Sequence, residues 1–134
     1  MRLELTRRYA FAAAHRLHSS ALSIEENERL YGKCNRPEPH GHSYFVEVVI
    51  KSQLDPRTEA AYDLGKLDKV SVSILNELDY KYLDADVAPF RNQPSTGENI
   101  ARYLWEQFQA KLDCEVETLR LWETPNNQFR VVGK

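Results

Sequence analysis

The order of the repeating patterns constrains the fold more than any other feature: two helical stretches adjoin in mid-chain, with two strand-like stretches on each side. Polar and apolar residues alternate in the strand-like segments 2–17, 40–51, 116–123 and 128–132. Apolar residues recur at helical spacing in two stripes between them: Leu67, Val70, Ile74, Leu75 and Leu78, then Ile100, Leu104, Phe108 and Leu112. The order ββααββ predicts an α+β fold, with a four-stranded antiparallel sheet and two helices on one face.

Capping residues place the helix starts. The segment Ser23-Ile24-Glu25-Glu26 is a capping box, so we expect a short helix from there towards Gly32. Asp63 suits the N-cap of the next helix, and Ser95-Thr96-Gly97-Glu98 is a second capping box that opens the last one. No repeat, low-complexity stretch or Gly/Ser-rich linker interrupts the chain, so we expect residues 1–134 to form a single domain.

Composition and charge exclude several classes of protein. Apolar residues make up 42% of the chain and charged residues 28%, as in ordinary globular domains. The net charge of −2 offers no general basic field, so we expect no nucleic-acid partner. No apolar run approaches the ~18 residues of a membrane helix, so we expect no membrane partner. Two cysteines are too few for a disulfide scaffold, which favours a reducing compartment and a cytoplasmic location.

The four histidines are unevenly spaced, and three of them could meet. His40 and His42 are two residues apart, so on a strand both side chains project from the same face. His15 lies at the end of the first strand, on its apolar face. Three imidazoles suit a zinc ion with an open fourth position, which is the arrangement of catalytic sites. The spacing equally allows a buried core His15 and two unrelated loop histidines.

Cys34 lies in a loop rather than in a helix or strand. It could be a fourth zinc ligand, a buried apolar side chain or a reactive thiol beside the metal. Lys33 and Arg36 flank it, and nearby cations lower the pKa of a thiol, which favours the reactive interpretation. Cys114 lies between the second of the two long predicted helices and the third strand. It fits an inert buried cysteine better.

Glu123 interrupts an otherwise apolar strand face. Alternation from Leu119 and Leu121 places its side chain on the inner face, where a carboxylate needs a hydrogen-bonding partner. It could anchor a ligand by accepting two parallel N–H bonds from a guanidine-like edge. Alternatively, the strand could end there and release Glu123 into solvent.

Several motifs occur in an order that resembles a known family. They are Phe11-Ala12-Ala13-Ala14-His15-Arg16-Leu17, Gly32-Lys33-Cys34-Asn35, His40-Gly41-His42 and Trp122-Glu123-Thr124. Together they resemble the 6-pyruvoyltetrahydropterin synthase family, which includes 6-carboxytetrahydropterin synthase. The resemblance implies a tunnelling fold (T-fold), in which the antiparallel sheets of several subunits close a barrel with the helices outside. It also implies a homo-oligomer, typically a hexamer built as a dimer of trimers, with active sites between subunits.

Site residues carry over from this resemblance position by position. The zinc ligands would be His15, His40 and His42. Cys34 matches the catalytic cysteine of the family, and Glu123 matches the glutamate that anchors the pterin.

Four further positions match the family, one of them with a different residue. Asp79 matches the aspartate of the catalytic triad, but Tyr80 stands where the family has a histidine directly after it. The catalytic candidates are therefore Cys34, Asp79 and Tyr80, and Tyr80 would act as a proton donor. Thr96 and Glu98 match positions near the pterin, although the capping box alone would also explain Glu98.

The activity implied by the resemblance is that of a zinc-dependent carbon–oxygen lyase. It would convert 7,8-dihydroneopterin triphosphate to 6-pyruvoyltetrahydropterin and release triphosphate. One alternative is 6-carboxytetrahydropterin synthase, which also releases acetaldehyde. The five residues between Cys34 and His40 resemble the pyruvoyl-forming members more closely. Another alternative is a pterin-binding zinc protein with reduced catalysis because of Tyr80. Both tetrahydrobiopterin and queuosine biosynthesis are compatible pathways.

Overall fold

A computed structural model describes residues 2–133 of the chain. Its elements, in chain order, are β1 (Leu3–His15), α1 (Ile24–Tyr31), η1 (Gly32–Asn35), β2 (His40–Ser52), α2 (Leu64–Asn76), β3 (Lys81–Tyr82), α3 (Leu83–Asp86), η2 (Ala88–Arg91), α4 (Gly97–Lys111), β4 (Glu115–Thr124) and β5 (Asn127–Val132). The four strands and the long helices predicted from the sequence are all present, in the predicted order.

The sheet has five strands rather than the predicted four. Their order is β3-β1-β2-β4-β5, and β1–β2, β2–β4 and β4–β5 are antiparallel pairs. The added strand, β3, pairs in parallel with Ala13 and Ala14 of β1. Two residues are too few to produce a recognisable alternation, which is why the sequence pattern did not reveal this strand.

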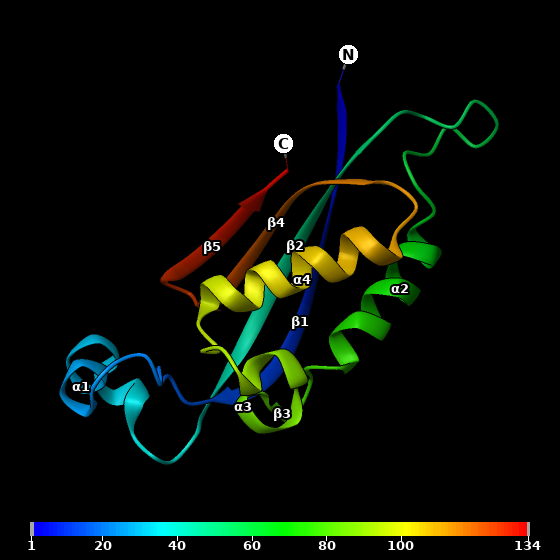
Figure 1. Ribbon diagram of the computed structural model, residues 1–134. Helices are drawn as coiled ribbons and strands as arrows, with labels where there is room; N and C mark the ends of the chain where they lie inside the picture. The colour runs from blue at the N-terminus through cyan, green and yellow to red at the C-terminus, as the bar shows by residue number, and fades with distance from the viewer. Residues whose placement is uncertain (1, 134) are drawn as a thin grey trace.

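Helices α2 and α4 cover one face of the sheet (Figure 1). The core lies between these two layers, and its fully buried side chains include Val46, Leu67, Leu104, Phe108 and Leu119. At the N-terminus of α4, a Cβ on Gly97 would come within 2.0–2.5 Å of the Phe129 ring, so only glycine allows the helix to approach β5 this closely.

The other face of the sheet is not covered by any described element. There the Arg8 guanidinium lies over the rings of Phe45 and Trp122, at 4.4 and 5.3 Å from their centroids. Arg120 pairs with Glu47 on the same face, at 3.6 Å. Phe45 is 39% exposed, so this face leaves aromatic surface in contact with solvent.

Two of the three predicted helix starts are confirmed, and one is wrong by a residue. Ser23 and Glu26 form the capping box of α1, and Asp63 caps α2. Helix α4 is capped by Thr96, whose side chain accepts from the N–H of Asn99, and not by Ser95. The capping box therefore does not form there, because the Ser95 hydroxyl donates to Asp84 instead.

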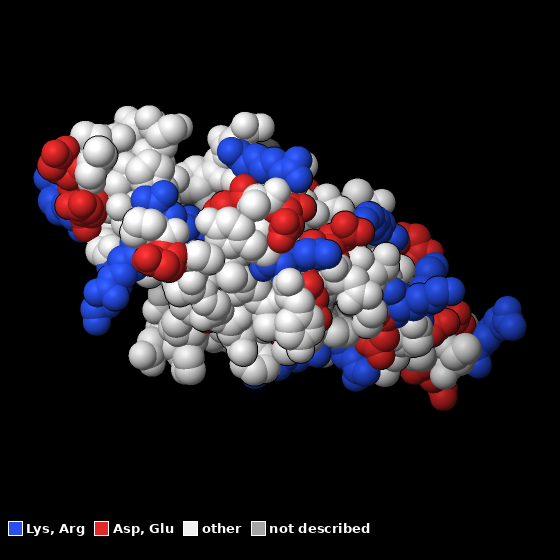
Figure 2. All heavy atoms as spheres, turned by 90° about the horizontal axis from the view of Figure 1, so that it is seen from below, with Lys and Arg blue, Asp and Glu red and all other residues white. Residues whose placement is uncertain are grey.

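The surface carries charges of both signs. Figure 2 shows lysines and arginines interleaved with aspartates and glutamates on the face seen from below. Within the described part of the chain, no helix combines the length and the apolar character needed to cross a membrane. Helix α1 lies beyond the end of the sheet away from the two chain termini (Figure 1), close to where β1 ends and β2 begins.

Candidate active site

The register of β1 and β2 brings three histidines together at this end of the sheet. His15 lies opposite His40, and Ala13 lies opposite His42, so all three imidazoles project from the same face. One ring nitrogen from each histidine lies within 4.8 Å of the corresponding nitrogens of the other two. The rings of His15 and His40 are 4.5 Å apart and those of His15 and His42 are 5.0 Å apart, both edge to face. This confirms that the three histidines predicted to meet are clustered.

The chemistry of the histidine nitrogens fits a metal ion. His15 is fully buried, and its Nδ1 lies 2.8 Å from the carbonyl oxygen of Ser95. Because a carbonyl only accepts, Nδ1 must carry the proton, which leaves Nε2 as a lone-pair acceptor. The Nε2 atoms of His15, His40 and His42 are all buried without a hydrogen-bond partner among the described residues. Three such acceptors facing one space could hold zinc and leave a fourth position open.

Burial keeps the cluster neutral and therefore able to bind a cation. The pKa of His15 is lowered to about 4, mainly by desolvation and in smaller part by His40 and His42, against the hydrogen bond to Ser95. Burial also lowers the pKa values of His40 and His42. Neutral imidazoles at pH 7 are the form that binds a metal.

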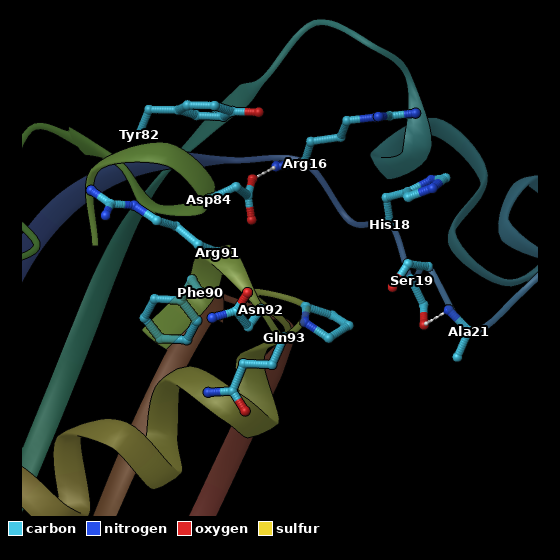
Figure 3. A pocket seen from close by; sticks show the side chains of 12 residues that line it. Arg16, His18, Ser19, Ala21, Tyr82, Asp84, Phe90, Arg91, Asn92 and Gln93 are labelled. Carbon is cyan, nitrogen blue, oxygen red and sulfur yellow. Dashed lines mark hydrogen bonds between the residues drawn. The ribbon is translucent and has the colours of Figure 1, made fainter. Parts of the chain in front are cut away.

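A chain of hydrogen bonds behind His15 fixes its orientation, and sequence reasoning missed it. Ser95 accepts from His15 through its carbonyl and donates to Asp84 through its hydroxyl. The other oxygen of Asp84 accepts from the backbone N–H of Arg16 at 2.7 Å (Figure 3). Ser95 and Asp84 lie far from the histidines in the sequence, and no local pattern identifies them.

The hollow beside this chain is not lined by a converging set of cations. Arg16, His18 and Arg91 line it with Tyr82, Asp84 and Phe90. The guanidinium groups of Arg16 and Arg91 extend in opposite directions, as Figure 3 shows. Arg16 donates to the Asn35 carbonyl at 3.0 Å, and Arg91 donates to the Ala85 carbonyl at 2.8 Å.

Cys34 is tied through its backbone to the segment after β1, and its thiol pKa shifts in the direction opposite to the predicted one. Its carbonyl accepts from the N–H of Leu17 at 2.8 Å, which ties η1 to the segment after β1. Burial raises the pKa of the Cys34 thiol, and the Glu123 charge raises it further. The prediction that Lys33 and Arg36 lower this pKa is wrong, because residues adjacent in sequence do not offset burial. Cys34 is also not part of the group of converging metal-ligand atoms.

Glu123 occupies the inner face of β4, as predicted. Its side chain is buried, with 9% of its surface exposed, and its Oε1 lies 3.9 Å from His42 Nε2. Because burial keeps His42 neutral, this contact is not an ion pair. Burial raises the pKa of Glu123, His40 lowers it and Glu98 raises it. A buried carboxylate beside the cluster is suited to accept N–H bonds from a ligand.

Thr96 and Glu98 lie at the start of α4. The Thr96 oxygen caps the helix by accepting from Asn99 at 3.2 Å, and its hydroxyl hydrogen remains able to donate. Glu98 is exposed and lies near enough to Glu123 to raise the pKa of that residue. Since α4 begins one residue later than predicted, the capping box no longer explains Glu98.

Asp79 and Tyr80 bond to the backbone of β1 and do not belong to the group of converging metal-ligand atoms. Asp79 Oδ1 accepts from the N–H of Ala12 at 2.9 Å, and the N–H of Tyr80 donates to the Ala12 carbonyl at 2.6 Å. Tyr80 is 87% exposed and lines a hollow that includes His42 as well as Ala12, Ala14 and Ser43. The last three alternate with the histidine positions along β1 and β2, so their side chains project from the other face of the sheet.

Tyr44 adjoins the histidine cluster and is not among the predicted site residues. It follows His42 by two residues on β2, is fully buried, and its ring lies 5.7 Å from that of His42. Burial raises the pKa of Tyr44 far above its usual value, and the charges of Glu123, Asp84 and Cys34 raise it further. The alternation His-x-His-x-Tyr is the signal that could have identified it.

Comparisons with known proteins agree over almost the whole chain. The sequence profile of the family described as 6-pyruvoyl tetrahydropterin synthase matches residues 4–134. The 6-pyruvoyl tetrahydrobiopterin synthase of Homo sapiens is 43% identical over 126 residues, which cover 92% of this chain and 87% of the human protein. The dihydroneopterin monophosphate aldolase of Pyrococcus furiosus is 32% identical over 133 residues, covering 98% of this chain and 96% of the relative.

The fold has a close counterpart among solved structures. The structure of Caenorhabditis elegans 6-pyruvoyl tetrahydropterin synthase superposes with a TM-score of 0.95 at 37% sequence identity. The match covers 100% of this chain and 97% of that one. The α+β tunnelling fold expected from the sequence is thereby confirmed for the single chain.

Proposed function

Because the chain belongs to the 6-pyruvoyl tetrahydropterin synthase family, we propose that it converts 7,8-dihydroneopterin triphosphate to 6-pyruvoyltetrahydropterin and releases triphosphate. The observation that carries this proposal is the convergence of three unpartnered histidine nitrogens beside the buried Glu123 carboxylate. This arrangement offers a zinc position and a pterin anchor within one site. The proposal classes the protein as a zinc-dependent carbon–oxygen lyase.

The chain's own residues divide the work between binding and proton transfer. His15, His40 and His42 would hold zinc, which when bound supplies a Lewis acid that acidifies the C–H and O–H bonds of the substrate side chain. Glu123 accepts the N–H groups of the amino-pyrimidine edge and so fixes the pterin ring. Cys34 removes and returns a proton of the side chain. Its raised pKa means that it rests as a thiol until a nearby positive charge favours the thiolate.

We further propose that the site is completed between subunits of a homo-oligomer, a hexamer formed as a dimer of trimers. Two observations support this: the exposed aromatic face of the sheet, and the bond of Asp79 to the backbone of β1 rather than to its own histidines. Within residues 2–133, the outer edge of β1 is paired only at Ala13 and Ala14, and β5 is an edge strand. Such edges are available for pairing with another chain. The proposed location is the cytoplasm.

Product identity tests the proposed reaction. Zinc-loaded protein is incubated with 7,8-dihydroneopterin triphosphate, and the products are identified by mass spectrometry. We expect 6-pyruvoyltetrahydropterin and triphosphate, without acetaldehyde. Acetaldehyde with 6-carboxytetrahydropterin would identify the alternative synthase. Release of an aldehyde that still carries the phosphates, with no free triphosphate, would indicate cleavage of the side chain by aldolase chemistry, as in the name of the Pyrococcus furiosus relative. Binding of the pterin without any product would identify a pterin-binding protein.

A further inference from the structure

Polar atoms without partners are concentrated at one place in the molecule. Among the described residues, five buried side-chain nitrogen or oxygen atoms have no hydrogen-bond partner. Four of them are neighbours on β1 and β2: the Nε2 atoms of His15, His40 and His42, and the hydroxyl of Tyr44. A metal ion would satisfy the three nitrogens. It would not satisfy the hydroxyl, which needs an acceptor to donate to.

The Tyr44 ring is held firmly, so its hydroxyl has a fixed position. The ring stacks on Phe11 with a centroid distance of 4.7 Å and an interplanar angle of 6°. Its edge meets the rings of His42 at 5.7 Å and His15 at 6.3 Å. Phe11 shows that a ring without a hydroxyl packs well in this layer. Burying the Tyr44 hydroxyl without a partner costs free energy that a phenylalanine would not lose.

We propose that the Tyr44 hydroxyl donates a hydrogen bond to the ligand oxygen that lies against the three histidines, and so selects pterins that carry a side-chain hydroxyl. This inference rests on the proposed function, because it requires a pterin in the site. It assigns Tyr44 a role in substrate binding that is separate from the anchoring of the ring by Glu123. The charges of Glu123 and Asp84 reach Tyr44, but neither carboxylate accepts from its hydroxyl, so the acceptor has to come from a ligand. The fixed ring directs the donor without reorganisation.

The binding experiment compares two pterins on two proteins. Neopterin carries side-chain hydroxyls and 6-methylpterin does not, and calorimetry measures the affinity of each for zinc-loaded wild type and Tyr44→Phe. We expect the wild type to prefer neopterin, and Tyr44→Phe to weaken neopterin binding roughly tenfold, the effect of one lost hydrogen bond. Affinity for 6-methylpterin and zinc content should not change.

The stability of the metal-free protein supplies an independent readout. Because the hydroxyl has no partner within the described structure, Tyr44→Phe should leave the melting temperature of the metal-free protein unchanged or raise it. Tyr9→Phe is the matched control, since the Tyr9 hydroxyl donates to Asp68 at 2.6 Å. That substitution should lower the melting temperature and leave the affinities for both pterins unchanged.

Each outcome decides the question. A lower melting temperature for metal-free Tyr44→Phe would show that the hydroxyl has a partner in the protein and would overturn the inference. Loss of zinc in Tyr44→Phe would make the phenol a metal ligand and overturn it as well. If the wild type prefers neopterin and Tyr44→Phe keeps the full preference, this inference fails and the proposed function stands. A wild-type protein that binds neither pterin refutes both.

Discussion

Asp79 holds the backbone of Ala12: its Oδ1 accepts the Ala12 N–H at 2.9 Å, and this fixes the carboxylate at the outer edge of β1. The histidines project from the inner face of the same sheet, so one chain does not bring Asp79 to its own metal ligands. If both groups take part in the reaction, they must come from different subunits.

Mixed oligomers test this arrangement. We expect Asp79→Asn and His42→Ala to be nearly inactive alone, and their co-expressed hybrids to regain up to about one quarter of the wild-type rate per site, because random mixing completes that fraction of sites between subunits. Asparagine is chosen because its side-chain oxygen can still accept the Ala12 N–H. Differently tagged chains allow hybrids to be purified and assayed. Purified hybrids with no recovered activity would show that the site does not combine these residues from two chains.

Tyr80 offers a test of how the proton relay departs from that of the family. Its backbone has φ = 58°, a left-handed conformation that costs about 1 kcal/mol or more for a bulky residue. Since 87% of the side chain is exposed, Tyr80→His should fold normally. An imidazole exchanges protons near neutral pH, so we expect turnover at pH 7 to rise at least several-fold, within the roughly hundredfold range of general acid–base catalysis.

The control for this substitution is Tyr80→Phe, which keeps the ring and removes the hydroxyl. It should be slower than both other proteins if the phenol donates a proton. Turnover of the three proteins, measured between pH 6 and 9, shows whether Tyr80 is a weak substitute for histidine or a specialised residue. A wild type that remains faster than Tyr80→His throughout that range would make Tyr80 a specialised residue rather than a weak substitute.

Cys34 leads to a prediction about pH. Burial first, and then Glu123, disfavour the thiolate, so the folded protein holds the proton to higher pH than a free thiol, whose pKa is about 8.5. We expect the rate of Cys34 alkylation by iodoacetamide to rise with pH and to reach its midpoint above that value in the metal-free protein. Glu123→Gln removes the second cause and should shift the profile to lower pH, but not fully, because burial remains. The experiment uses a Cys114→Ala background, so that Cys34 is the one cysteine that can be alkylated.

Two results would contradict this account of the thiol. One is a wild-type alkylation profile with its midpoint below the pKa of a free thiol, which would mean that Lys33 and Arg36 control the pKa of Cys34. The other is a Glu123→Gln profile that coincides with the wild-type profile, which would mean that Cys34 and Glu123 do not interact.

Patterns repeated along the chain predicted most of the fold, whereas contacts between distant segments were not predictable. Alternation placed His15, His40 and His42 on one face, and the β1–β2 register then made them neighbours. The support of His15 by Ser95 depends on how the loop before α4 folds back onto β1, which no local pattern encodes.

The errors have the same physical origin. Ser95 was assigned as a helix cap because the Ser-x-x-Glu spacing matches a capping box, but its hydroxyl is used by Asp84, eleven residues earlier in the chain. The pKa of Cys34 was assigned from its sequence neighbours, but its surroundings in space are burial and Glu123. In both cases a tertiary contact outweighed the local pattern.

Zinc titration tests the central claim most directly. Zinc is added in steps to metal-free protein while triphosphate release from 7,8-dihydroneopterin triphosphate is followed. The account predicts that the rate rises in proportion to zinc and levels off at about one ion per chain, as expected for a three-histidine site with an open position. His42→Ala should bind little zinc and stay at the baseline, and Cys34→Ala should bind zinc normally but release little triphosphate. Full activity in metal-free protein, or one zinc bound per chain with no triphosphate released, would contradict the account.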